Sequence, residues 1–221
     1  VVGDPNQAIY GFRGADSKSL ARLQQELQAG ALGLTTTYRC GKAIVAEAQQ
    51  FVPHFEAGEG NSEGEIKRVI REDMLPLVAY GDFILSRLNA PLAGYAMQLL
   101  RSQRRARIAG RDIGQGLKTL VRRFAKGAAD MEAFLANVEV HAQKQRARFL
   151  ALKWESKITE LEDTVETLGT IAEGCETTQE MEQVIDALFT DDGLGDKGMV
   201  TLSSVHKAKG LEADRVWLLQ E

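Results

Sequence analysis

The sequence has few of the residues that several specialised classes of protein require. Its 221 residues include two cysteines, Cys40 and Cys175, too far apart to indicate a disulfide framework or a cysteine-based metal site. No hydrophobic run approaches the roughly 18 residues needed for a membrane-spanning helix. No basic segment followed by an apolar stretch, as in a secretory leader, opens the chain. We therefore expect no membrane partner and a reducing, cytoplasmic location.

The composition is nevertheless sufficient for a folded protein. Hydrophobic residues make up 44% and charged residues 26% of the chain, which allows a real core and roughly one to two domains of ~100–200 residues. The first two residues, Val1 and Val2, resemble the end of a buried strand rather than a native start with Met. We expect the chain to be a piece of a longer protein.

Charge is distributed unevenly along the chain, although the net charge is only −4 and the pI is 5.6. Residues 155–196 are strongly acidic, whereas only Asp112 opposes the basic residues of segment 101–126. Because phosphate neutralisation is a contact effect, local patches decide whether nucleic acid binds. The basic segment is either a face that contacts nucleic acid or a solvated helix face; it comprises Arg101, Arg104, Arg105, Arg107, Arg111, Lys118, Arg122, Arg123 and Lys126.

The first half of the chain alternates between helical and strand patterns. Apolar spacing predicts helices after Asp16, over 44–52 and from Pro91 to 100. The helix over 44–52 would have on its buried side Ile44, Val45, Ala48, Phe51 and Val52. Short apolar or Thr-rich runs predict strands at 34–38, 65–70, 82–89 and 107–109. Such alternation favours a parallel sheet covered by helices.

The second half changes character. No convincing strand pattern occurs between Gly116 and Phe189, and the apolar residues of segments 131–138 and 158–168 have helical spacing, which predicts a helical hairpin. Strand patterns return at 199–202 and 216–219. We predict an α/β fold whose parallel sheet is interrupted by an all-helical insertion.

The loop from Gly3 to Ala15 is the segment that says most about function. It combines the amide of Gln7, the rings of Tyr10 and Phe12 and the guanidinium of Arg13. An amide can bond a phosphate oxygen or an attacking water, and aromatic rings can stack on bases of any sequence. The alternatives are a turn-forming amide, rings packed beneath the loop and a surface ion pair.

Three separated segments resemble one family. The opening loop resembles motif III of superfamily 1 DNA helicases of the UvrD/Rep/PcrA type, Thr37–Cys40 is similar to their motif IV, and Ser204–Glu212 is similar to their motif V. Segment 84–90 also resembles the strand between motifs IV and V. The resemblance implies RecA-like parallel sheets of the P-loop NTPase type, with ATP between two such domains and single-stranded DNA across both.

The same resemblance implies an organisation along the chain. Residues 1–30 would end the first RecA-like domain, and residues 31–110 would begin the second. Residues 111–197 would form the helical insertion subdomain, and residues 198–221 would return to the second domain with motif V.

The resemblance also implies which residues contact the nucleotide. Gln7 would sense the terminal phosphate and Arg39 would act as an arginine finger, both catalytic roles. Tyr38 would stack on adenine, while Gly210 and Glu212 would lie beside the nucleotide. The cofactor would be ATP with Mg²⁺ held by residues outside this chain, and we expect no metal site within it.

The implied nucleic-acid contacts come from three places: motif III, the carboxyl end of the strand near residue 86, and motif V. By itself, His206 is more often a polar turn residue. The implied contact residues are Tyr10, Phe12, Arg13, Arg87, Asn89, Thr201, Ser204 and His206.

The chain also departs from the family pattern. Ala8, Thr37 and Ala213 replace a serine, an asparagine and an aromatic residue that are usual in these motifs. The sequence contains no Gly-x-x-x-x-Gly-Lys-Ser/Thr phosphate loop, no Asp-Glu pair and no motif VI arginine. We therefore expect this chain alone to be catalytically inactive.

The predicted function is that of a fragment of an ATP-dependent DNA helicase or translocase, moving 3′ to 5′ on single-stranded DNA and acting at a duplex junction. Three alternatives stay open at this point. The chain could be a non-catalytic module that binds single-stranded nucleic acid, the helicase part of a helicase–nuclease, or a protein that docks a partner through its acidic helical insertion. The sequence does not distinguish DNA from RNA as the substrate, and it does not indicate the pathway or the oligomeric state.

Overall fold

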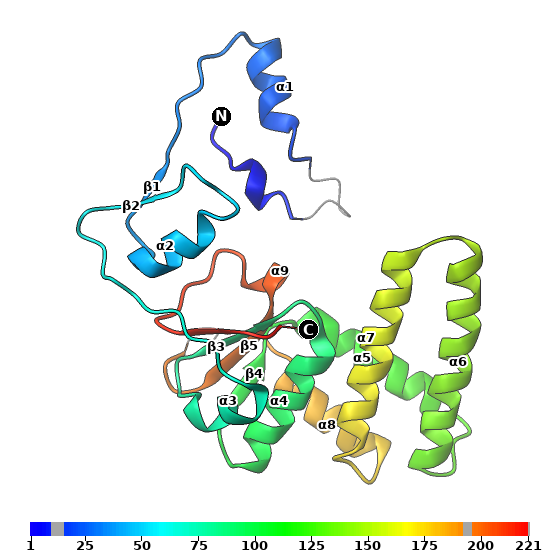
Figure 1. The fold of residues 1–221 in the computed structure, drawn as a ribbon. Coiled ribbons are helices and arrows are strands. Elements are labelled where there is room, and N and C mark those ends of the chain that lie inside the picture. The colour runs from blue at the N-terminus through cyan, green and yellow to red at the C-terminus, as the bar shows by residue number, and fades with distance from the viewer. Residues whose placement is uncertain (10–15, 192–195, 221) are drawn as a thin grey trace. The chain divides into compact units, whose positions relative to one another are not determined.

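The computed structural model describes residues 1–9, 16–191 and 196–220, and its backbone divides into two compact units, 1–73 and 74–221 (Figure 1). Within these ranges, no helix combines the length and the hydrophobicity that crossing a membrane requires.

The first unit contains short elements. A 3-10 helix, η1 (Pro5–Gln7), begins at Asp4, whose carboxylate accepts a hydrogen bond from the backbone N–H of Asn6 at 2.9 Å. Helix α1 (Ser19–Glu26) follows, as its leucine spacing predicts, but none of its residues is buried. The helix prediction is therefore confirmed.

A parallel strand pair, β1 (Thr36–Thr37) and β2 (Glu56–Ala57), flanks helix α2 (Lys42–Ala48). Only Val45 of this helix is buried; Ile44 is 45% exposed and Phe51, just beyond it, is 84% exposed. A helix of two turns has room to bury one narrow stripe, so the wider apolar face expected over 44–52 is wrong.

The strand predicted at 65–70 is also wrong, because these residues have no regular secondary structure. A strand needs a neighbour to satisfy its backbone groups, and the two-stranded sheet of this unit pairs β1 only with β2.

The second unit is built on a four-stranded sheet in which all strands are parallel. Its strands are β3 (Phe83–Ser86), β4 (Ala106–Ile108), β5 (Val200–Ser204) and β6 (Val216–Leu218), in the order β4-β5-β3-β6. Strand β3 pairs with β5 from Phe83↔Thr201 to Ser86↔Ser204. The predicted α/β class with parallel strands is thus confirmed.

Parallel strands need crossover connections, and here helices supply them. Helix α3 (Arg71–Leu77) precedes the sheet, α4 (Asn89–Arg101) joins β3 to β4, and α9 (Val205–Ala208) follows β5. Between β4 and β5 the chain forms four consecutive helices, of which α6 and α7 form a long hairpin in Figure 1. These four helices are α5 (Arg111–Ala125), α6 (Met131–Ala151), α7 (Glu155–Ala172) and α8 (Thr178–Leu188).

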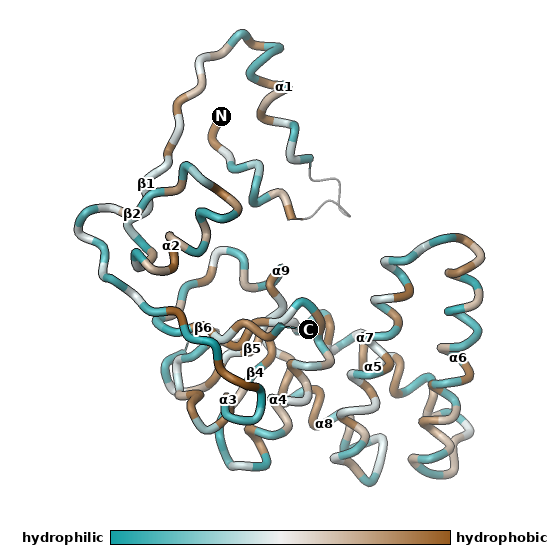
Figure 2. Tube along the Cα trace, in the orientation of Figure 1, coloured by the Kyte–Doolittle hydropathy of each residue, from teal (hydrophilic) through white to brown (hydrophobic). Residues whose placement is uncertain are grey.

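One hydrophobic core joins the sheet to these helices. Ile84 of β3, Leu202 of β5 and Leu92 of α4 are fully buried, and so are Leu168 of α7 and Ile185 of α8. Figure 2 shows hydrophobic segments along the sheet strands and alternating colours along the α6–α7 hairpin. The four-helix segment therefore shares its core with the sheet instead of folding as a separate body.

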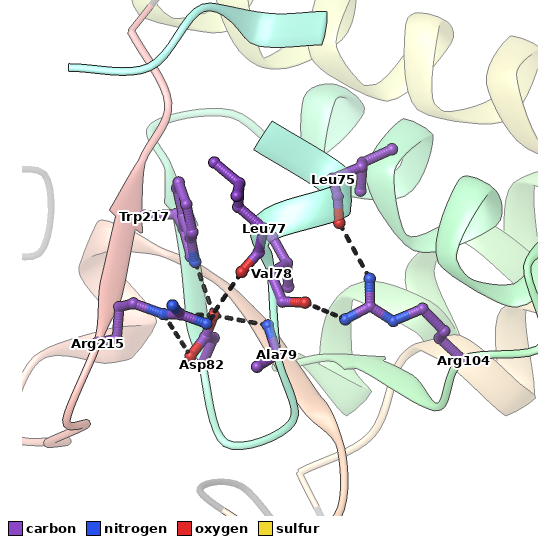
Figure 3. A network of polar contacts seen from close by, with 8 residues as sticks. All are labelled: Leu75, Leu77, Val78, Ala79, Asp82, Arg104, Arg215 and Trp217. Atoms are coloured by element: carbon purple, nitrogen blue, oxygen red, sulfur yellow. Dashed lines mark hydrogen bonds and ion pairs between the residues drawn. The ribbon is translucent and has the colours of Figure 1, made fainter. Parts of the chain in front are cut away.

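A polar network fixes the amino ends of β3 and β6 (Figure 3). Asp82 is 5% exposed, and its carboxylate accepts hydrogen bonds from the side chains of Arg215 at 2.9 Å and Trp217 at 2.8 Å and from the backbone N–H of Ala79 at 2.8 Å. Burial alone would raise the pKa of Asp82, but these hydrogen bonds together lower it below its ordinary value.

A second arginine completes this edge by satisfying backbone carbonyls at the end of α3. The guanidinium of Arg104 donates to the carbonyl oxygens of Leu75 and Val78. Because this edge lies opposite the carboxyl ends of the strands, we assign the network to the stability of the sheet.

Candidate functional site

The carboxyl edge of the parallel sheet brings two of the predicted segments together. Ser86 and Ser204 are paired neighbours at the ends of β3 and β5, so the residues that follow them leave the sheet side by side. Open parallel sheets bind their ligands at this edge. Arg87, which follows β3, therefore lies next to the start of the helix that contains His206.

Arg87 is exposed, and its side chain makes no hydrogen bond or ion pair with any described residue. By contrast, Arg215 and Arg104 of the same unit are both engaged by acceptors of the protein. An exposed guanidinium without a partner in the described structure can donate to a phosphate oxygen at little cost.

The segment that resembles motif V forms a capped helical turn after β5. The hydroxyl of Ser204 accepts the backbone N–H of Lys207 at 3.3 Å, and Ser204 is 8% exposed. The Lys207 ammonium contacts Asp112 in the first turn of α5 at 2.6 Å, and this hydrogen bond lowers the pKa of Asp112. The hydroxyl of Ser204 is thus used to cap α9, while His206 in the same turn is half-buried.

Thr201 does not reach this edge. It lies opposite Phe83 in the first half of β5 and is 1% exposed. Its contact with nucleic acid stays a prediction that its burial does not support.

Asn89 lies at the edge, but its side chain is turned toward the helical segment. Its Nδ2 donates to Asp163 of α7 at 2.8 Å, and the backbone N–H groups of Asn89 and Ala90 donate to the same carboxylate at 2.7 and 2.8 Å. Asp163 is 8% exposed and therefore caps the N-terminus of α4 from a distant part of the chain. A positioning role for Asn89 is visible in the structure, whereas contact with DNA is still a prediction.

Gly210 and Glu212 complete the motif V segment. Gly210 has φ +90°, a left-handed backbone that favours glycine, and open space surrounds the position that a Cβ would occupy. Glu212 is exposed.

In the first unit, Tyr38 presents its ring to solvent. The side chain is 81% exposed, yet one part of the ring lies so close to Gly58 that a Cβ there would be 2.6 Å from Tyr38 Cδ1. Asn61 holds the same loop in place by donating to the carbonyl oxygens of Thr37 and Cys40, each at 2.8 Å. The ring is therefore positioned by its loop and open for stacking.

Two other predicted nucleotide contacts lie in this unit. Arg39 follows Tyr38 and is exposed, and its backbone N–H donates to Thr37 Oγ1 at 3.3 Å. Gln7 lies in η1, where its amide donates to Asp4 Oδ2 at 2.9 Å. The predicted strand contacts Tyr10, Phe12 and Arg13 lie outside the described residues.

Sequence reasoning missed two residues that hold the candidate sites in place. Asp163 fixes Asn89 at the carboxyl edge of the sheet, and Asn61 fixes the loop around Tyr38. Asp163 is one acidic residue within a long acidic run, and Asn61 lies in a polar loop. Asp163 acts on Asn89, 74 residues away, and Asn61 acts on Thr37, 24 residues away. No local pattern marks either one.

Within the described ranges, no group of three or more His, Cys, Asp or Glu side chains is arranged to hold a metal ion.

Comparison with known proteins adds one result. Residues 1–28 match the family model of the UvrD/REP helicase N-terminal domain. The match relates the chain to UvrD-type helicases. It covers the loop identified as motif III, η1 and α1, whereas a comparison with curated protein sequences found no match.

Proposed function

We propose that the chain is part of a superfamily 1 ATP-dependent DNA helicase that moves 3′ to 5′ along single-stranded DNA and opens duplex DNA. The family match to residues 1–28 carries the proposal, because it falls on the segment that contains the amide of Gln7 and the rings of Tyr10 and Phe12. In this proposal Gln7 links the nucleotide to the strand that Tyr10 and Phe12 stack upon.

The carboxyl edge of the four-stranded sheet supports the nucleic-acid side of the proposal. Arg87 is an exposed cation at the end of β3, and His206 lies on the short helix that follows the neighbouring strand. Arginine binds phosphate through a planar, permanently charged fork. We propose that this edge holds the backbone of the translocated strand, within a second RecA-like domain.

The loop around Tyr38 supports the nucleotide side. An exposed ring braced by Gly58 can stack on adenine, and the adjacent Arg39 can neutralise charge on the phosphates. ATP with Mg²⁺ would supply the free energy for translocation, with the Mg²⁺ ligands outside this chain. The residues present would orient the base and stabilise the charge that develops on the transferred phosphoryl group.

The test uses the longest natural protein that contains this chain. We expect its ATP hydrolysis to rise at least several-fold with single-stranded DNA, and its strand displacement to require a 3′ tail. Unwinding only from a 5′ tail would overturn the direction. DNA binding without any ATP hydrolysis would overturn the proposed enzymatic activity and favour a non-catalytic binding module.

Arg87→Ala is the variant for the carboxyl edge, and Arg148→Ala on α6 is its matched control because both arginines are exposed. We expect Arg87→Ala to raise the DNA concentration that half-stimulates hydrolysis and to leave basal hydrolysis unchanged. Equal effects of the two variants would mean that net charge, and not this edge, governs DNA binding.

A further inference from the structure

A cationic pocket lies between the end of α5 and the middle of α6, away from the carboxyl edge described above. Its volume is about 310 Å³, and its mouth is open to solvent. Four of its lining side chains are basic, and among the described residues no aspartate or glutamate lines it. The lining residues are Arg123, Phe124, Lys126, Asn137, Val140, His141 and Lys144.

The positive charge of this pocket is not neutralised by the described part of the protein, in contrast to the rest of the same helix. On α5, Lys118 pairs with Asp186 and Arg122 pairs with Glu182, each at 2.5 Å. The side chains of Arg123, Lys126 and Lys144 make no ion pair or hydrogen bond with any described residue. The basic side chains on one face of α5 are thus neutralised by carboxylates of α8, whereas those on the other face keep their positive charge.

The wall of the pocket is ordered by contacts between its own residues. The rings of Phe124 and His141 lie 5.1 Å apart, and the guanidinium of Arg123 lies 5.5 Å from the centre of the Phe124 ring. Asn137 donates to the backbone carbonyl of Phe124 at 3.1 Å. Burial, followed by the charges of Arg123 and Lys144, lowers the pKa of His141, as expected in an electropositive site.

We propose that this pocket binds a phosphate group of a nucleic-acid backbone. Lysine and arginine without internal carboxylate partners are the usual donors to backbone phosphates. A peptide ligand would need a deeper apolar anchor, and here the Phe124 ring is buried and Val140 is the only other hydrophobic lining residue. This inference rests on the proposed function, because it adds a second DNA contact to the same protein.

The test compares two pairs of substitutions that each remove two exposed cations. Lys126→Gln with Lys144→Gln removes charge from the pocket, whereas Arg148→Gln with Lys153→Gln removes it from the far end of α6. Binding to a blunt duplex and to a single-stranded 20-mer is measured by fluorescence anisotropy between about 50 mM and 200 mM salt.

Each lost phosphate contact removes about 0.9 from the salt slope for duplex and about 0.7 for a single strand. Between about 50 mM and 200 mM salt, we expect the pocket variant to lose about 10-fold less duplex affinity than the unmodified protein loses. The control pair should lose as much affinity as the unmodified protein. The nucleic-acid form with the larger change is the one whose backbone occupies the pocket.

Two outcomes would overturn the proposal that the pocket binds a nucleic-acid phosphate. One is an equal change in both pairs of variants; the other is competition by polyglutamate as effective as that by DNA, which would show that the pocket takes any polyanion. A parent protein that hydrolyses ATP in response to DNA, but whose pocket variant keeps the original salt slope, would disprove the pocket and leave the helicase proposal intact. If the protein binds no nucleic acid, both proposals fail.

Discussion

At the scale of single residues, a comparison of Tyr38 with Phe51 can distinguish a functional role of an exposed ring from a structural one. Phe51 belongs to the same unit and is as exposed, at 84% against 81%, but lies outside the motif segments. Removing either ring therefore costs little burial. Only the loss of Tyr38 would affect a stacked base.

We predict that Tyr38→Ala raises the KM for ATP in the parent protein, since one stacking contact contributes roughly 1–3 kcal/mol, equivalent to about 5-fold or more. Phe51→Ala should leave KM unchanged. Steady-state hydrolysis at saturating DNA measures both variants. An unchanged KM in Tyr38→Ala would mean that this ring does not contact the nucleotide.

The carboxylate of Asp82 makes stability depend on pH. Its pKa is lowered in the folded state from the ordinary value of 3.8, so the unfolded chain binds a proton more readily. The stabilisation is complete above the unfolded value and is lost as the pH falls through the folded value. We predict a loss of unfolding free energy as the pH falls below about 4.

Urea denaturation at several pH values between about 6 and 2.5 measures this loss, with Asp82→Asn as the comparison. The variant should be less stable at pH 6 and should lose less on acidification, because it has no carboxylate to protonate. Parallel pH profiles for the two proteins would show that other carboxyl groups are responsible.

At the scale of elements, helix α5 contains two glycines in contrasting surroundings. A Cβ at Gly114 would lie 2.6 Å from the Cβ of Phe189, whereas a Cβ at Gly116 would meet no atom within 4 Å. Gly114 therefore permits the close approach of the residue after α8. Gly116 only weakens the helix.

We predict opposite effects for two identical substitutions. Gly116→Ala should stabilise the protein by about 0.5–1 kcal/mol through helix propensity. Gly114→Ala should destabilise it by about 1–3 kcal/mol through overpacking. Thermal unfolding followed by circular dichroism measures both, and stabilisation by Gly114→Ala would contradict the packing described between α5 and Phe189.

How well an element could be predicted from the sequence depended on how local its cause is. The strand expected within 82–89 rests on a hydrophobic run and a neighbouring turn that are continuous in sequence, and it is confirmed at 83–86. The expected strand at 65–70 has a comparable pattern but no partner, and pairing is decided by the rest of the fold. Asp163 shows the same limit for the site, because its effect on α4 depends on a contact across 74 residues.

At the scale of the whole molecule, the described core belongs to the unit of residues 74–221. Every member of the main hydrophobic cluster lies in this unit, while Val45 is the only hydrophobic residue counted as buried among the described residues of the other unit. Local opening is easiest where few apolar contacts must be broken. The two units should therefore differ widely in local stability.

We predict that amide hydrogen exchange is slowest in β3, β5 and α4 and fastest in residues 1–73. Mass spectrometry of proteolytic fragments after timed deuteration resolves this difference. The chain should show protection of many hours in the central strands and of minutes or less around α1. Uniform protection across both units would contradict the assignment of the core.

The pairing of β3 with β5 has a consequence for synthesis on the ribosome. Strand β5 leaves the exit tunnel more than a hundred residues after β3, so at ordinary elongation rates β3 waits roughly ten seconds for the first of its two neighbours. During that interval its backbone is an open edge that another chain could occupy. Nascent chains stalled with β5 still inside the tunnel should accordingly recruit more chaperone than chains stalled after β5 and β6 have left it.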